Sequence, residues 1–294
     1  MDGNGRTILV AGATGQQGSA SARHLLEDGW RVRAVTRDAS KPGAQALFRM
    51  GAEVIEANME DQASLDRVLQ GIYGVYSVQN FWLPGVGFDG EVRQGKNMAD
   101  AARAAGVQHF VYSSVGGAER NSGIPHFESK WIVEGHIRGL GLPATILRPV
   151  FFMDNLNYSR QEILKEGTIK GGMRPDEKLQ MVAVDDVGAF VAMAFSRPQD
   201  FIGRAIELAG DELTYPEMAD VLSRVMSRPI HYVQIPLDVI RQASEENAKM
   251  VAWFNDQGYK ADISYLRTLR PEMLSFEAWL QRSGWDRMAS EKAA

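Results

Sequence analysis

Glycines near the N-terminus have the spacing of a phosphate-binding loop. Gly12, Gly15 and Gly18 follow an apolar strand over residues 7–11 and open a helix that ends at Gly29. Glycines let the backbone approach a pyrophosphate, and a helix N-terminus offers unpaired N–H groups and the positive end of its dipole. Because strand, turn and helix come in the required order, we expect a dinucleotide here rather than an ordinary turn. The predicted contacts are Gly12, Thr14, Gly15, Gln16, Gln17 and Gly18.

The end of the second strand is expected to choose between NAD and NADP. In such sites an acidic residue about 20 positions past the loop binds the ribose 2′-hydroxyl of NAD, whereas positive charge receives the 2′-phosphate of NADP. Here the strand ends in Thr36 and is followed by Arg37, with Lys41 close behind. The planar guanidinium of Arg37 suits phosphate, so we predict NADP(H), with Thr36, Arg37 and Lys41 as contacts. The alternative is that Asp38 serves NAD while Arg37 is solvated.

An alternation of strands and helices through residue 150 must position these residues. The expected strands cover residues 7–11, 31–36, 53–56, 74–78, 109–113 and 144–148. The helices expected after the first one cover residues 44–50, 64–70, 91–105 and 130–138. Ser64 is the expected N-cap of its helix. Near-continuous apolar strands indicate a buried parallel sheet covered on both faces, so we predict an α/β fold with a Rossmann-like doubly wound sheet.

The rhythm changes after Pro149. Residues 154–172 are typical of a helix followed by a glycine-rich turn, and residues 179–184 of a strand. Asp185 is the expected cap of a helix over 187–195. Thr214 and Glu217 have the spacing of a capping box. Aromatic-rich helices follow, so we predict a smaller, mostly helical C-terminal lobe.

The domain boundaries follow from this change of rhythm. The NADP-binding domain is expected over residues 1–150, joined by residues 179–208. The lobe for a substrate or a partner is expected over residues 151–178 and 209–294. Open α/β sheets bind ligands at their carboxyl edge, where such a lobe would lie.

Further motifs stand along the chain beside the glycine loop. They are Gln79-Asn-Phe-Trp82, Glu91-Val-Arg-Gln-Gly-Lys96, Val111-Tyr-Ser-Ser114, His126-Phe-Glu-Ser-Lys130 and Leu147-Arg-Pro-Val-Phe-Phe-Met-Asp-Asn155. Taken together they resemble the NmrA-like family, an atypical branch of the short-chain dehydrogenase/reductase superfamily that includes a redox sensor. The resemblance spans most of the chain. It implies a Rossmann-like domain that prefers NADP and a smaller C-terminal domain, but no particular substrate.

The resemblance raises a question about catalysis. Ordinary members of the superfamily use a Tyr-x-x-x-Lys pair and a serine, in which the lysine holds the nicotinamide ribose and the tyrosine exchanges a proton with the substrate. This chain has His126 in place of the tyrosine, then Lys130, while Ser113 or Ser114 can supply the serine. With an ordinary pKa near ~6.5, a histidine can serve as the acid, or it can simply pack beside Pro125.

The candidate catalytic residues are therefore Lys130, His126 and Ser113. Lys130 is also a predicted cofactor contact; its alternative is an exposed position on a helix. Gln79, Asn80 and Phe81 follow the fourth strand, where a loop should pass the cofactor. Their alternative is a loop whose aromatic rings hold it to the second lobe.

Composition excludes several classes of protein. The 294 residues are 45% apolar and 23% charged, as in a soluble globular protein. Zero cysteines exclude disulfides, thiolate metal sites and cysteine catalysis, and the histidines show no metal-ligand spacing. A net charge of −5 without a basic tract argues against direct nucleic-acid binding. We see neither a membrane span nor a secretion signal, and expect a cytoplasmic protein.

Two functions fit these features. The first is an NADPH-dependent oxidoreductase acting on a small carbonyl or quinone-like acceptor. The alternative is a non-catalytic NADP(H)-responsive redox sensor that binds a regulatory protein partner. Nucleotide-sugar epimerisation shares the fold, but the missing tyrosine disfavours it. Neither the substrate nor the oligomeric state follows from the sequence.

Overall fold

The computed structural model describes residues 5–286, which divide into two compact units. The first unit comprises the residues through Asn121, then Pro125–Arg148 and Val187–Ile206. The second comprises Ser122–Ile124, Pro149–Asp186 and the residues from Glu207 onward. Residues 179–186, expected in the first domain, lie in the second unit, because their strand pairs with two strands of that unit.

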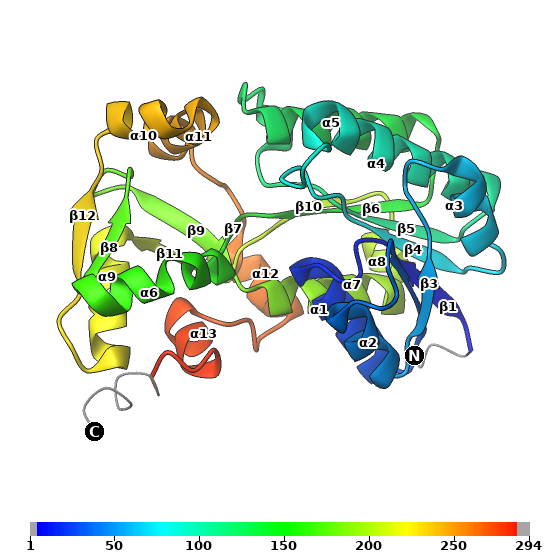
Figure 1. The fold of residues 1–294 in the computed structure, drawn as a ribbon, viewed down its shortest axis with the longest axis horizontal. Coiled ribbons are helices and arrows are strands. Elements are labelled where there is room, and N and C mark those ends of the chain that lie inside the picture. Colours follow the sequence, from blue (N-terminus) through cyan, green and yellow to red (C-terminus); the bar gives the residue numbers. More distant parts are fainter. Residues whose placement is uncertain (1–4, 287–294) are drawn as a thin grey trace. The chain divides into compact units, whose positions relative to one another are not determined.

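A seven-stranded sheet forms the centre of the first unit, in the order β10-β6-β5-β4-β1-β2-β3 (Figure 1). Strands β1 to β6 pair in parallel with their neighbours in that order. The strands are β1 (Thr7–Val10), β2 (Arg31–Thr36), β3 (Glu53–Glu56), β4 (Gly74–Ser77), β5 (His109–Ser113), β6 (Ala144–Pro149) and β10 (Ala205–Leu208). In the inner strands of the sheet the apolar residues are largely buried, as the near-continuous apolar runs predicted, whereas Val54 and Ile55 of the edge strand β3 are half-buried.

Helices cover both faces of this sheet (Figure 1). On one side lie α3 (Gln62–Val68), α4 (Gly87–Ala104) and α5 (Pro125–Gly139). On the other lie α1 (Gln16–Glu27), α2 (Pro42–Arg49) and α7 (Val184–Ser196). The remaining elements are the short helix α8 (Pro198–Phe201) and the 3-10 turn η1 (Ala118–Arg120). The first side is sealed by a core that includes Leu65, Met98 and Val133, one from each of its helices.

Strand order reverses beside β1, and open α/β sheets typically bind ligands at such a point. β1 pairs with β2 on one side and with β4 on the other, so the chain crosses over β1 between β3 and β4. The connections that leave β1 and β4 therefore diverge at the carboxyl edge of the sheet. The glycine loop follows β1, and residues 78–82 follow β4, so both lie at this point.

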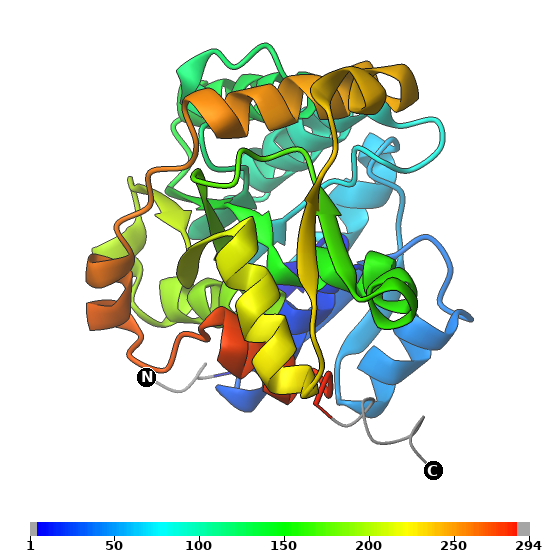
Figure 2. The ribbon, with the colours of Figure 1, turned by 90° about the vertical axis from the view of Figure 1, so that its left-hand side faces the viewer.

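The second unit combines small sheets with helices, and Figure 2 shows it from the front. Its strands are β7 (Phe151–Phe152), β8 (Thr168–Gly171), β9 (Lys178–Val182), β11 (Asp211–Thr214) and β12 (His231–Gln234). Its helical elements are η2 (Met153–Asn155), α6 (Leu156–Glu166), α9 (Tyr215–Met226), α10 (Leu237–Ala243), α11 (Glu245–Asp256), α12 (Ile263–Leu269) and α13 (Phe276–Arg282). Helix α9 packs against β8, β11, β12 and α13, and Met181, Leu222 and Trp279 share one core.

Several local predictions are corrected by the structure. Asp61 rather than Ser64 caps α3, because the Asp61 carboxylate accepts a hydrogen bond from the Ser64 amide. Asp185 does not cap α7, which begins one residue earlier at Val184. The expected glycine-rich turn after α6 contains strand β8, which pairs with β12. The capping box of Thr214 and Glu217 is confirmed.

Candidate functional site

The glycine loop is built so tightly that side chains are excluded at two of its positions. Gly12 has φ +65°, and a Cβ on it would lie 2.9 Å from the Val78 carbonyl oxygen at the end of β4. A Cβ on Gly18 would lie 2.1 Å from the Gly12 carbonyl oxygen. Gly15 is the N-cap of α1, and no side chain caps this helix. The N-terminal amides and the helix dipole of α1 therefore remain available to a phosphate.

The loop after β2 carries positive charge beside the glycine loop. Arg37 and Lys41 are exposed, and a Cβ on Gly43 would lie 3.5 Å from Thr14 Cβ. The Asp38 carboxylate accepts hydrogen bonds from the amide (2.9 Å) and hydroxyl (2.6 Å) of Ser40, which lower its pKa. Asp38 is thus occupied with folding its own loop. This arrangement favours Arg37 over Asp38 as the residue that faces the adenosine ribose.

Gln17 connects the glycine loop to the ends of two strands. Its side-chain oxygen accepts a hydrogen bond from Ser113 Oγ at 2.6 Å and one from Tyr76 Oη at 3.2 Å. Burial raises the pKa of Tyr76 to about 12, so its hydroxyl stays protonated and can donate. Ser113 is fully buried. Its hydroxyl therefore has a partner within the protein, on the side of the sheet that α1 covers.

The residues after β4 differ strongly in exposure. Gln79 is buried, with its amide nitrogen 2.9 Å from Ser77 Oγ. Asn80 is exposed, and its side-chain oxygen accepts a hydrogen bond from the Trp82 amide at 3.0 Å. The Trp82 side chain is 61% exposed. Asn80 thus shapes the turn that presents the two aromatic rings of Phe81 and Trp82.

His126 lies at the start of α5 among aromatic rings. Its ring centroid is 5.7 Å from that of Phe81, 5.2 Å from that of Trp82 and 4.8 Å from that of Phe127. The side chain is 9% exposed. This environment supports the packing alternative for His126 and keeps its ring next to the loop that follows β4.

Lys130 is held by a buried carboxylate. Its ammonium nitrogen lies 2.8 Å from Glu91 Oε1, and the Ser129 hydroxyl donates to Glu91 Oε2 at 2.5 Å. Glu91 is fully buried and the Lys130 side chain is 12% exposed, which excludes the alternative of an exposed helix lysine. An ammonium has three donors, and Glu91 is the hydrogen-bond partner of Lys130 within residues 5–286. Lys130 is therefore fixed in place with donors left for a ligand.

With this geometry in place, the chain can be compared with known proteins. Residues 4–280 match the model of the NmrA-like family. The chain belongs to the NmrA-like family. The match confirms the resemblance carried by the motifs, and with it the Rossmann-like α/β fold.

Proteins similar to this chain include named reductases. An NmrA-like family domain-containing protein of Dictyostelium discoideum is 27% identical, covering 94% of this chain and 97% of its own. An NAD(P)H azoreductase of Xenophilus azovorans is 30% identical, covering 80% and 79%. Two solved structures share the fold. One is NmrA, a negative transcriptional regulator, in complex with NADP; its TM-score is 0.79 at 22% identity, over 99% of this chain and 98% of its own. The other is an NADPH-dependent quinone oxidoreductase of Escherichia coli with NADPH; its TM-score is 0.80 at 23% identity, over 94% of this chain and 98% of its own.

Glu91 is the residue of this NmrA-like site that sequence reasoning missed. It lies in the buried stripe of α4 with Gly95, Met98 and Ala102. A carboxylate at helical spacing on an otherwise apolar face must find a partner, because an unpaired buried charge is costly. That periodicity was the available signal for a cation facing α4.

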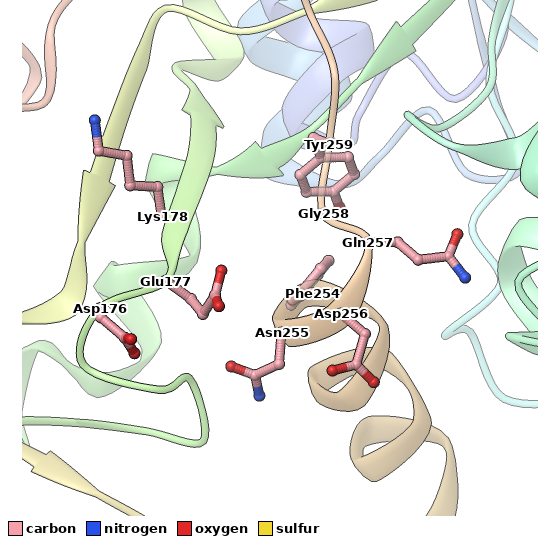
Figure 3. A pocket seen from close by; sticks show the side chains of 9 residues that line it. All are labelled: Asp176, Glu177, Lys178, Phe254, Asn255, Asp256, Gln257, Gly258 and Tyr259. Carbon is pink, nitrogen blue, oxygen red and sulfur yellow. The ribbon is translucent and has the colours of Figure 1, made fainter.

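The second unit contains a separate cavity of about 340 Å³ between the start of β9 and the end of α11 (Figure 3). Its lining is polar and includes Glu177, Asp256 and Tyr259. Arg174 pairs with both Glu177 and Asp256, so these two carboxylates share one cation. None of the predicted site residues lines this cavity.

Two classes of structure are not found in residues 5–286. No group of three potential ligands there could hold a metal ion. In the same part of the chain, no helix combines the length and the apolar character that crossing a membrane requires.

Proposed function

We propose that this chain binds NADP(H) at the glycine loop and acts as an NADPH-dependent reductase of a small carbonyl or quinone-like acceptor. The observation that carries the proposal is the combination of a glycine-only turn, exposed Arg37 and a prepositioned Lys130. These residues meet the three needs of the nucleotide: close approach to the pyrophosphate, charge for the 2′-phosphate and donors for a ribose. The reductases among the relatives and the fold shared with NADPH-binding structures support the same reading.

Each residue has a defined task in this proposal. The amides at the start of α1 bind the pyrophosphate, and Arg37 with Lys41 binds the 2′-phosphate. Lys130, fixed by Glu91, donates hydrogen bonds to the nicotinamide ribose. Bound NADPH would supply the hydride. His126 would hold the proton for the acceptor oxygen, replacing the tyrosine of ordinary members.

A quinone-like acceptor suits a site in which the acid is a histidine packed among aromatic rings. The oxygen anion of a reduced quinone is less basic than an alkoxide, so its formation depends less on a strong acid. We expect NADPH oxidation with several quinones or enals in a spectrophotometric panel. A flat baseline across that panel, with NADPH binding intact, would contradict the reductase proposal.

The second candidate is an NADP(H)-responsive regulator without catalysis. It is favoured by one observation, the packing of His126 among the rings of Phe81, Trp82 and Phe127. A sensor must bind the oxidised and reduced cofactor with different affinity, since equal affinity cannot shift a conformational equilibrium. Calorimetric titration with NADP⁺, NADPH and NAD⁺ separates the cases. Equal affinity for NADP⁺ and NADPH would rule out a function as redox sensor.

A further inference from the structure

Two buried polar atoms at the carboxyl ends of β4 and β5 have no partner in the described part of the chain. Gln79 and Ser114 are each 4% exposed. Neither the side-chain oxygen of Gln79 nor the hydroxyl of Ser114 makes a hydrogen bond within residues 5–286. A buried polar group left unpaired costs about 1–3 kcal/mol, so such atoms normally meet a ligand or an ordered water.

The two side chains lie at the same level of adjacent strands. The parallel register of β4 and β5 pairs Ser77 with Tyr112, and the same register continued by two residues pairs Gln79 with Ser114. The Gln79 amide nitrogen donates to Ser77 Oγ at 2.9 Å, so the Gln79 side chain lies on the same face of the sheet as that of Ser77. The Ser114 amide donates to the Leu147 carbonyl at 2.8 Å, which extends the ladder past β5. Neighbouring strands lie about 4.8 Å apart, so one small group can contact both side chains.

This face of the sheet is the one that α4 and α5 cover. Tyr112 packs in one core with Met98 of α4 and Val133 of α5, and side chains alternate along a strand, so Ser114 shares that face. Burial raises the pKa of Tyr112 well above its ordinary value, and the Glu91 carboxylate adds to the rise. Glu91, the partner of Lys130, therefore lies near this face of the sheet. Ser113 points to the opposite face, where Gln17 holds its hydroxyl.

We propose that Gln79 and Ser114 form a two-point site for a primary carboxamide. The Gln79 oxygen accepts from the amide NH₂, and the Ser114 hydroxyl donates to the amide carbonyl. A ketone oxygen would satisfy Ser114 alone, and a carboxylate would be repelled by the Gln79 oxygen. Given the proposed function, on which this inference rests, the carboxamide is that of the nicotinamide ring, so Ser114 rather than Ser113 is the serine that contacts the cofactor.

The test compares NADP⁺ with its 3-acetylpyridine analogue, in which a methyl group replaces the NH₂. By isothermal titration calorimetry we expect the full-length chain to bind NADP⁺ about 5-fold more tightly than the analogue, the effect of one hydrogen bond. Gln79→Leu should remove this preference. Ser114→Ala should weaken both nucleotides by a similar factor and leave their ratio unchanged.

Two controls separate this inference from the function on which it rests. Adenosine 2′,5′-bisphosphate lacks the nicotinamide and should bind wild type, Gln79→Leu and Ser114→Ala equally, which also shows that the variants are folded. Ser113→Ala, the neighbouring buried serine, should keep the preference for NADP⁺ over the analogue. If the bisphosphate binds but wild type shows no preference, or Gln79→Leu retains it, the two atoms hold water and the inference is wrong. If wild type binds neither the bisphosphate nor NADP⁺, the proposed function fails and the inference fails with it.

Discussion

Glu91 and Glu134 are both fully buried carboxylates of the first unit, and each is paired with a cation. Glu134 faces two guanidinium groups: Arg148 contacts it through Nε at 2.9 Å and Nη2 at 2.8 Å, and Arg138 contacts it at 2.5 Å. The remaining Arg148 nitrogen, Nη1, lies 2.7 Å from Glu119. Each of the three nitrogens of this guanidinium thus contacts a carboxylate, and in this sense we call the pair saturated.

The pair of Glu91 and Lys130 is arranged differently. Glu91 contacts one ammonium and one hydroxyl, and the ammonium keeps donors that no described residue uses. A saturated pair can only hold the fold together, whereas an unsaturated buried cation can bind a ligand without being reorganised. Burial of the carboxylate and pairing alone do not mark a functional ion pair; a largely buried cation that keeps donors for a ligand does.

The largest effect should follow from breaking the saturated pair. Glu134→Gln leaves Arg148 and Arg138 facing a neutral amide, so we expect a loss of about 3–5 kcal/mol in the free energy of unfolding by urea denaturation. Glu91→Gln should cost clearly less, because only one cation loses its carboxylate: the glutamine oxygen can still accept from Lys130, and the Ser129 hydroxyl can turn to accept from the glutamine NH₂. Equal losses in the two variants would erase the distinction between the pairs.

His109 is a buried titratable group of the same unit, and its protonation should make the free energy of unfolding depend on pH. Burial lowers the pKa of His109 to about 4. The unfolded histidine takes up its proton near pH ~6.5, so the contribution of His109 is complete above that pH and is lost as the pH falls towards 4. The loss amounts to about 3 kcal/mol at most.

We expect His109→Gln to flatten the dependence of urea midpoints on pH over this interval. His109 bonds to Thr145 Oγ1 at 2.8 Å, a contact that glutamine can keep. An unchanged pH profile in the variant would show that another group controls stability there.

The smallest effect concerns binding. Lys130→Met removes the unused donors, and we expect the Kd for NADPH to rise about 10-fold, which corresponds to roughly 1.4 kcal/mol. Arg138→Met is the matched control, since Arg138 is a cation of the same helix that also pairs with a buried glutamate. Arg138→Met should lower the free energy of unfolding but leave the Kd for NADPH unchanged. If both variants weaken NADPH binding alike, Lys130 acts through the fold alone.

The sequence predicted the parts of the site that depend on local chain geometry. Gly12 and Gly18 could be recognised because only glycine fits a turn that brings backbone atoms so close. Arg37 could be predicted as a contact of the 2′-phosphate from its position in the sequence, about 20 residues past that loop. The Glu91 pair was not recognisable, since it joins residues 39 positions apart on two helices that only the tertiary fold brings together. Ser113 and Ser114 were equivalent in sequence, and only the pleat assigned them to opposite faces.

Calorimetric titration of the 294-residue chain with NADPH and with NADH tests the proposed nucleotide site. We expect saturable binding of NADPH, and at least about 10-fold weaker binding of NADH, because NADH lacks the phosphate that Arg37 and Lys41 would bind. Arg37→Ser should bring the two affinities together. Failure to bind NADPH, or equal affinity for both nucleotides in the unaltered chain, would contradict the central claim.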